Sequence, residues 1–147
     1  MFLNCAIQRE VGIAGGNSVH ELEAMLVYDD GLYRVEMPVG FQHDGSSVPR
    51  LPAMFLFFGG KGLRSGALHD YCYRKDAKFF DYKNWEWVTP SYSQANMLYR
   101  RALKTSAYGA FTYFGMWFGV AVGGWPHFHK RAVLDRVQLD VSYEVNF

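Results

Sequence analysis

Alternation of apolar and polar residues is clearest at the C-terminal end of the chain and around one central turn. Residues 137–147 place six apolar side chains at every second position, which predicts a half-buried strand. Residues 23–28 and 32–37 are strand-like runs on either side of Asp29-Asp30-Gly31. Because Asp-Gly favours the tight turn of a hairpin, these two runs predict an antiparallel pair.

The other segments show weaker patterns. Residues 2–7 are a short apolar run that indicates an edge strand, whereas residues 11–18 contain three glycines and predict a loop. Residues 78–90 are rich in aromatic side chains and predict a long connection over one face of the domain. Ser65 is a candidate N-cap for a helix that runs to about Asp76.

Helical spacing of apolar residues predicts a second helix that begins at Ser91 or Ser93. The twenty residues 107–126 carry no formal charge, and Gly115, Gly119 and Gly123 recur at intervals of four. That length and spacing fit a membrane span. The many glycines and the polar Tyr and Thr side chains favour a helix buried by protein instead, with its glycines facing a neighbouring element.

Strands at both ends of the chain and helices in its middle predict an α+β fold. We expect one domain over residues 1–147, in which an N-terminal hairpin and a C-terminal strand form a small antiparallel sheet packed with three to four helices. The net charge of +1 gives no basic surface for nucleic acid. Two cysteines are too few for a disulfide framework, and residues 1–10 lack the pattern of a signal peptide.

The candidate chemistry lies in Leu68–Arg74. His69 and Tyr73 share one helix face, and an imidazole beside the carboxylate of Asp70 can bind a metal or activate a water molecule. The same residues also fit a buried, hydrogen-bonded histidine and an Asp70–Arg74 ion pair. A second polar cluster, around Asp44, lies in a loop, and we expect Asp44 to approach His69 because buried polar groups need partners.

Several motifs resemble a known family. Asp44-Gly45-Ser46-Ser47-Val48-Pro49-Arg50 and Ala67-Leu68-His69-Asp70-Tyr71-Cys72-Tyr73-Arg74, in this order, resemble the phage and prophage proteins of domain-of-unknown-function family 1353. Ser93-Gln94-Ala95-Asn96 and the apolar segment that ends at Trp125 are similar to that family's closing pattern. The resemblance covers about residues 24–126 and implies a phage origin, without settling an activity.

A looser resemblance links His69-Asp70-Tyr71-Cys72-Tyr73 to the helix motif of phospholipase A2. It implies that His69 is a general base, that Asp70 binds calcium and that Tyr73 orients the pair. The loop Gly59–Gly62 would then supply carbonyl ligands to calcium. Asn96 falls near the place of the family's orienting aspartate, and its amide can fix the imidazole tautomer without stabilising an imidazolium by charge.

The preferred functional hypothesis is a noncatalytic structural or assembly component of a bacteriophage tail, neck or baseplate. Such a protein needs no cofactor, binds other virion proteins or itself, and locates to the virion or the host cytoplasm. The alternative is a calcium-dependent esterase, phospholipase or cell-envelope hydrolase. Its catalytic group would be His69, Asp70, Tyr73 and Asn96, with Asp70 as metal ligand and Asp44, Ser47 and His43 in support. A third hypothesis is a membrane-associated phage protein built on residues 107–126.

Overall fold

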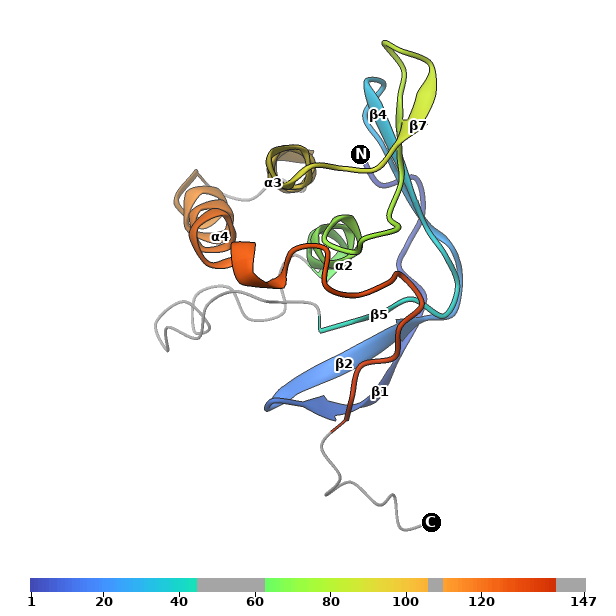
Figure 1. The fold of residues 1–147 in the computed structure, drawn as a ribbon, viewed down its shortest axis with the longest axis vertical. Coiled ribbons are helices and arrows are strands. Elements are labelled where there is room, and N and C mark those ends of the chain that lie inside the picture. Colours follow the sequence, from blue (N-terminus) through green and yellow to red (C-terminus); the bar gives the residue numbers. More distant parts are fainter. Residues whose placement is uncertain (45–62, 106–109, 140–147) are drawn as a thin grey trace.

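The computed structural model describes residues 1–44, 63–105 and 110–139 (Figure 1). In chain order its elements are β1 (Gln8–Ala14), β2 (Asn17–Leu22), β3 (Leu26–Asp29), β4 (Tyr33–Met37), β5 (Gln42–His43), α2 (Leu63–Cys72), β6 (Phe79–Asp81), β7 (Glu86–Val88), α3 (Tyr92–Thr105), α4 (Ala110–Gly123) and the 3₁₀ helix η1 (Trp125–His127). Antiparallel strands and helices are segregated, which confirms the predicted α+β fold.

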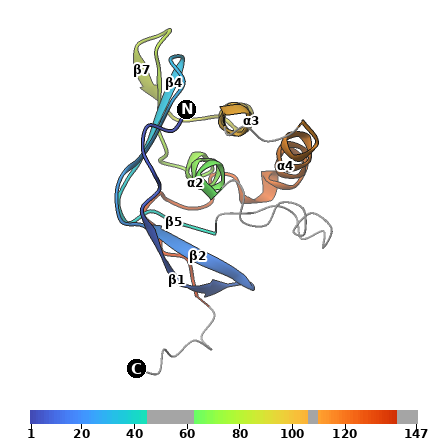
Figure 2. The same cartoon turned by 180° about the vertical axis from the view of Figure 1, so that it is seen from behind.

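The strands form two antiparallel sheets, one ordered β3-β4-β6-β7 and the other β1-β2-β5. Figures 1 and 2 show the three α-helices on one side of the larger sheet. The β6–β7 hairpin and the β1–β2 hairpin lie at opposite ends of the molecule (Figure 1). All the α-helices of the described residues therefore cover the same face of the larger sheet.

The predicted central hairpin is confirmed as β3 and β4. The Oδ1 of Asp30 accepts hydrogen bonds from the backbone N–H groups of Leu32 and Tyr33, at 3.0 and 2.9 Å. Gly31 adopts a φ of 82°, which an L side chain rarely adopts. Local turn chemistry thus fixes the register of this pair, in which Asp29 lies opposite Arg34.

In four segments the described residues contradict the predictions about strands. Residues 11–18 are not a loop but belong to the β1–β2 hairpin, whose turn has Gly15 and Gly16 at φ values of 55° and 80°. Within residues 2–7 the structure has only an isolated bridge, between Phe2 and Tyr28. Residues 78–90 contain β6 and β7 rather than a plain connection. Residues 136–139 form no strand, and the rest of the predicted C-terminal strand, 140–147, lies outside the described residues.

Helix α2 is the centre of the hydrophobic core. Its side chains from Ser65 to Leu68 are fully buried, and α3 and the larger sheet pack against it. The helix begins at Leu63, so Ser65 lies inside it and is not its N-cap, and it ends at Cys72 rather than Asp76. Because the core surrounds this helix, the residues on most of its faces are buried.

Helix α3 begins where the sequence predicted. The N–H of Ser91 donates to Oε1 of Gln94 at 2.9 Å, and the N–H of Gln94 donates to Oγ of Ser91 at 3.3 Å. This reciprocal pair is a capping box, which satisfies backbone donors that the first turn leaves without intrahelical partners. One face of the helix then buries a run of core side chains: Ala95, Leu98, Tyr99, Ala102 and Leu103.

Helix α4 differs from its prediction in how it packs. Its buried face consists of Tyr113, Met116 and Val120, whereas Gly115 and Gly119 are only half-buried. The face that α4 buries is therefore formed by larger side chains rather than by Gly115 and Gly119. None of the helices in the described residues combines the length and the hydropathy that a membrane span requires.

Candidate functional site

His69 lies in the middle of the buried helix α2, beside Asp70. The Nδ1 of His69 is 3.2 Å from Oδ1 of Asp70. Because an ionised carboxylate only accepts hydrogen bonds, Nδ1 carries the hydrogen and Nε2 carries a lone pair in the neutral ring. Among the described residues, Nε2 is buried and has no hydrogen-bond partner. One ring nitrogen of His69 therefore lies against Asp70, and the other has no hydrogen-bond partner among the described residues.

Aromatic rings cover the imidazole. The ring centroids of Tyr73 and Tyr99 lie 4.0 and 4.9 Å from that of His69, whose residue is only 5% exposed. Burial lowers the pKa of His69 to about 3, and the charge of Asp44 opposes that shift. His69 is thus neutral at physiological pH, and it is a weak base.

Tyr73 and Asn96 form a second hydrogen-bonded pair in this cluster. The hydroxyl of Tyr73 donates to Oδ1 of Asn96 at 2.9 Å, and both residues are buried. Burial is the main cause that raises the pKa of Tyr73. Asn96 therefore positions the tyrosine, whereas Nδ1 of His69 lies against Asp70.

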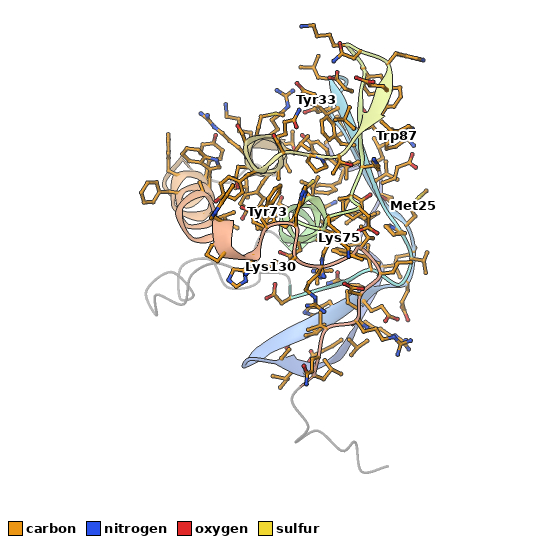
Figure 3. The ribbon with its side chains drawn as sticks, viewed as in Figure 1. Met25, Tyr33, Tyr73, Lys75, Trp87 and Lys130 are labelled. Atoms are coloured by element: carbon orange, nitrogen blue, oxygen red, sulfur yellow. The ribbon has the colours of Figure 1, made fainter. Side chains whose placement is uncertain are left out.

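The segment after α4 closes the cluster from the far side of Tyr73. The rings of Phe128 and Tyr92 lie 5.4 and 5.8 Å from that of Tyr73, and the N–H of His129 donates to the carbonyl of Tyr73 at 2.8 Å. A Cβ atom added at Gly124 would lie 2.3 Å from the Tyr73 hydroxyl. This glycine is needed for close approach, and Figure 3 shows Tyr73 among the helices.

Arg74 links α2 to two other parts of the chain. Its guanidinium donates to the carbonyls of Gln42 and Ala132, at 3.1 and 3.4 Å, and lies 5.6 Å from the centre of the Phe41 ring. Burial lowers the pKa of Arg74, while the charge of Asp70 acts in the opposite direction. Through these two hydrogen bonds Arg74 has a structural role, because it connects α2 with β5 and with the segment after η1.

The second polar cluster lies at β5. The Nε2 of His43 is 3.1 Å from Oε1 of Gln8, and its Nδ1 is buried without a partner among the described residues. Burial lowers the pKa of His43 to about 4, and the charge of His20 acts in the same direction. The charge of Asp44 acts to raise the pKa of both His43 and His69, against the effect of burial. Ser47 lies outside the described residues.

A calcium site of the phospholipase type would need six to eight oxygen ligands around Asp70. In the part of the chain that the structure describes, no three His, Cys, Asp or Glu side chains gather in a way that suits a metal ion. The Gly59–Gly62 loop, expected to provide carbonyl ligands, lies outside the described residues. The carboxylate of Asp70 lies against Nδ1 of His69, at 3.2 Å.

One surface was not singled out by sequence reasoning. The β6–β7 hairpin carries Phe80, Tyr82, Trp85 and Trp87, whose rings contact one another, and Trp85 is 74% exposed. Its sequence signal is the spacing of aromatic residues by two, on each side of Lys83-Asn84, which is typical of a hairpin with one aromatic face.

Comparison with known proteins gives one match. The model of a protein family described as "Protein of unknown function (DUF1353)" matches residues 20–120 of the chain. No curated protein and no solved structure matches it. The matched range includes α2 and α3, and thus all of His69, Asp70, Tyr73 and Asn96.

Proposed function

We propose that this chain, which belongs to the DUF1353 family of proteins of unknown function, is a noncatalytic structural or assembly component of a bacteriophage particle. The observation that carries the proposal is the closure of the His69 cluster. Its imidazole is 5% exposed, and its free Nε2 lies beneath other protein atoms. The phage origin rests on the resemblance of the chain's motifs to phage and prophage members of this family.

The electrostatics of the cluster also favour a packing role. A general base works best when its pKa lies near the operating pH, whereas burial brings the pKa of His69 to about 3. A hydrolytic histidine also needs support for its positive charge once it has taken a proton. Asn96, which falls near the place of the orienting aspartate in phospholipase A2, carries no charge and hydrogen-bonds Tyr73. The cluster therefore joins α2 to α3 through the Tyr73–Asn96 hydrogen bond and the contact of the His69 and Tyr99 rings.

Exposed aromatic residues fit contact with other proteins. Phe114 and Phe118, one turn apart on α4, are 56% and 63% exposed, and Trp125 on η1 is 66% exposed. Aromatic side chains are enriched at protein interfaces, and exposed apolar surface of this kind marks interaction sites. A particle component would bury these side chains against a neighbouring subunit.

The test uses phage particles from a strain that carries the gene. Particles would be purified by density gradient after prophage induction, and the protein would be quantified by mass spectrometry against a known tail protein. We expect a fixed copy number per particle that survives high-salt washing. Absence from purified particles, with the protein abundant in the lysate, would contradict the structural role.

A second candidate, hydrolysis, is favoured by one observation. The lone pair of Nε2 on His69, with Nδ1 held by Asp70, is the arrangement from which a histidine takes a proton from water. The assay is turnover of a short-chain phospholipid and of a p-nitrophenyl ester, with and without calcium, for the wild type and His69→Gln. We expect equal, background-level rates. Calcium-dependent turnover that His69→Gln abolishes would establish the hydrolase.

A further inference from the structure

The larger sheet presents one of its faces away from the helices. Its strand register aligns Arg34, Phe80 and Trp87 in one row across β4, β6 and β7. Neighbouring residues along each strand point to the opposite face, where Val35 and Phe79 are buried in the core. Figure 3 accordingly shows Tyr33 on the helix side of the sheet and Trp87 on the outer side. This outer surface of β4, β6 and β7 is referred to as the outer face.

Four aromatic rings gather on the outer face around Phe80. The ring centroids of Tyr82, Trp85 and Trp87 lie 5.1, 5.4 and 5.4 Å from that of Phe80. Trp85 and Trp87 remain 74% and 47% exposed. The helices pack on the other face of the sheet, so the hydrophobic core does not require these two indoles. Large aromatic side chains that remain in water favour a role in binding.

The backbone at Trp85 strengthens this conclusion. Trp85 has a φ of 57°, in the left-handed region where bulky residues are rare. Asn or Gly would occupy this turn position at lower cost. Asp81 already organises the turn, since it accepts hydrogen bonds from the N–H of Lys83 and from Nδ2 of Asn84, at 2.9 and 3.0 Å. The turn therefore does not need an indole, and Trp85 occupies this strained position while it remains exposed.

Polar groups border the aromatic rings. Arg34 donates to Glu36 at 2.7 Å and lies 3.6 Å from Asp29, and the hydroxyl of Tyr82 donates to Asp29 at 2.7 Å. Lys78 donates to Thr89 at 2.8 Å beside β6. The formal charges of Asp29, Glu36, Arg34 and Lys78 sum to zero, and each of these groups has further capacity for hydrogen bonds. The surface thus offers flat apolar rings beside a neutral set of donors and acceptors.

We propose that the outer face binds a neutral carbohydrate chain. A sugar ring has an apolar C–H face that stacks on an indole, and hydroxyl groups at its edge that bond to carboxylates, guanidinium groups and phenols. Trp85 and Trp87 provide the stacking surfaces, and Arg34, Asp29 and Tyr82 provide the partners for hydroxyl groups. The carbohydrate site does not depend on the proposed structural role, because it uses a different surface of the molecule.

Other ligand classes fit this face less well. Single-stranded nucleic acid stacks on aromatic rings but requires a basic groove, which a border of zero formal charge does not give. A quaternary ammonium ion requires an open ring of aromatic side chains, and Phe80 fills the centre of this cluster. An apolar protein surface would have to desolvate the Arg34–Glu36 ion pair, which is costly.

The test is affinity electrophoresis of the full chain in native gels that contain dextran, amylopectin or glycol chitin. We expect retardation in at least one gel and binding at least tenfold weaker for Trp87→Ala and for Trp85→Asn. Asn suits the backbone of the turn, so Trp85→Asn keeps the hairpin while it removes the indole. Trp125→Ala is the matched control, since Trp125 is also exposed but lies on η1, and it should bind as the wild type does.

Thermal unfolding of each variant checks that the fold is intact. Equal retardation of all variants would overturn the proposal, as would wild type that migrates normally in all three gels. Self-association of the wild type in analytical ultracentrifugation, lost in Trp85→Asn and without retardation in any gel, would assign the outer face to a second copy of the chain. That result would also overturn the carbohydrate site.

Discussion

The cluster around His69 and the outer face of the larger sheet are both dense in aromatic rings, but the first is buried and the second is exposed to solvent. Around His69, Tyr73 and Tyr99 pack over a polar group and remove it from solvent. On the outer face, Trp85 and Trp87 remain in solvent beside polar groups. The His69 motif, whose chemistry is easier to recognise, is thus closed to solvent. The outer face, which has no recognised motif, is accessible.

The largest expected effect is that of acid on stability, because it acts on buried imidazoles. The pKa values of His69 and His43 fall from 6.5 in the unfolded chain to about 3 and about 4 in the fold. Their contribution to stability is complete above pH 6.5 and is lost as the pH falls towards these values, because only the unfolded chain then takes up the protons. Each imidazole should remove about 1.4 kcal/mol of unfolding free energy per pH unit.

Urea unfolding, followed by circular dichroism between about pH 7 and pH 4.5, measures this slope. His69→Gln should reduce the slope by about half, because one of the two buried imidazoles is then missing. His127→Gln is the control, since His127 is exposed, and it should leave the slope unchanged. An unfolding free energy that does not change with pH would show that the imidazoles are not buried.

Truncating one aromatic residue in each region should give unequal losses. Tyr73→Ala removes a ring that packs on His69 and Phe128 and a hydroxyl that binds Asn96, so we expect a loss of about 3–5 kcal/mol. Trp87→Ala removes a half-exposed ring and should cost about 1 kcal/mol or less. Chemical denaturation of both variants makes the comparison. Equal losses would mean that the outer face belongs to the core.

Adding one methyl group near Tyr73 should also destabilise the fold. The Cβ of Gly124→Ala would lie 2.3 Å from the Tyr73 hydroxyl and 2.7 Å from the carbonyl of Val120, so we expect a loss of roughly 1–3 kcal/mol from overpacking. Gly31→Ala is the contrasting variant, because no atom lies within 4 Å and only its positive φ is unfavourable. Thermal unfolding of both shows whether packing or backbone strain dominates. A neutral Gly124→Ala would mean that the cluster is loosely packed.

The smallest effect is expected at the border of the outer face. Arg34→Gln removes the ion pair with Glu36, and both side chains are 33% exposed. Such a pair is worth about 0.2–1 kcal/mol and weakens as salt increases. Unfolding in low and high salt should therefore show a difference between wild type and variant that shrinks with salt. A large loss that is independent of salt would contradict this description of an exposed, solvated border.

The parts of the fold that the sequence predicted correctly depend on local chemistry. The turn at Asp29-Asp30-Gly31 and the start of α3 at Ser91 need only neighbouring residues, and both occur as expected. The β1–β2 hairpin was missed because β1 has no buried side chains at alternate positions. The bounds of α2 were wrong because a helix that the core surrounds on most faces shows no clear apolar stripe.

In the candidate site, too, contacts between sequence neighbours differ from contacts that depend on the packing of distant segments. His69 and Asp70 are neighbours in one helix and hydrogen-bond each other, although the sequence suggested calcium or Arg74 as the partner of Asp70. The contact of Tyr73 with Asn96, 23 positions away, depends on how α2 packs on α3, which no spacing reveals. The outer face depends on the pairing of β4, β6 and β7, so Arg34 and Trp87 meet only in the folded sheet.

The central claim is that His69 is a closed, neutral packing residue, and NMR of its imidazole tests this most directly. Histidine ring ¹⁵N and ¹H shifts would be followed by pH titration, with His69→Gln used to assign the signal. The account predicts a neutral ring with its hydrogen on Nδ1 that does not titrate until the pH approaches about 3. A ring that titrates near 6.5, its ordinary pKa, would contradict the account and would favour the hydrolase.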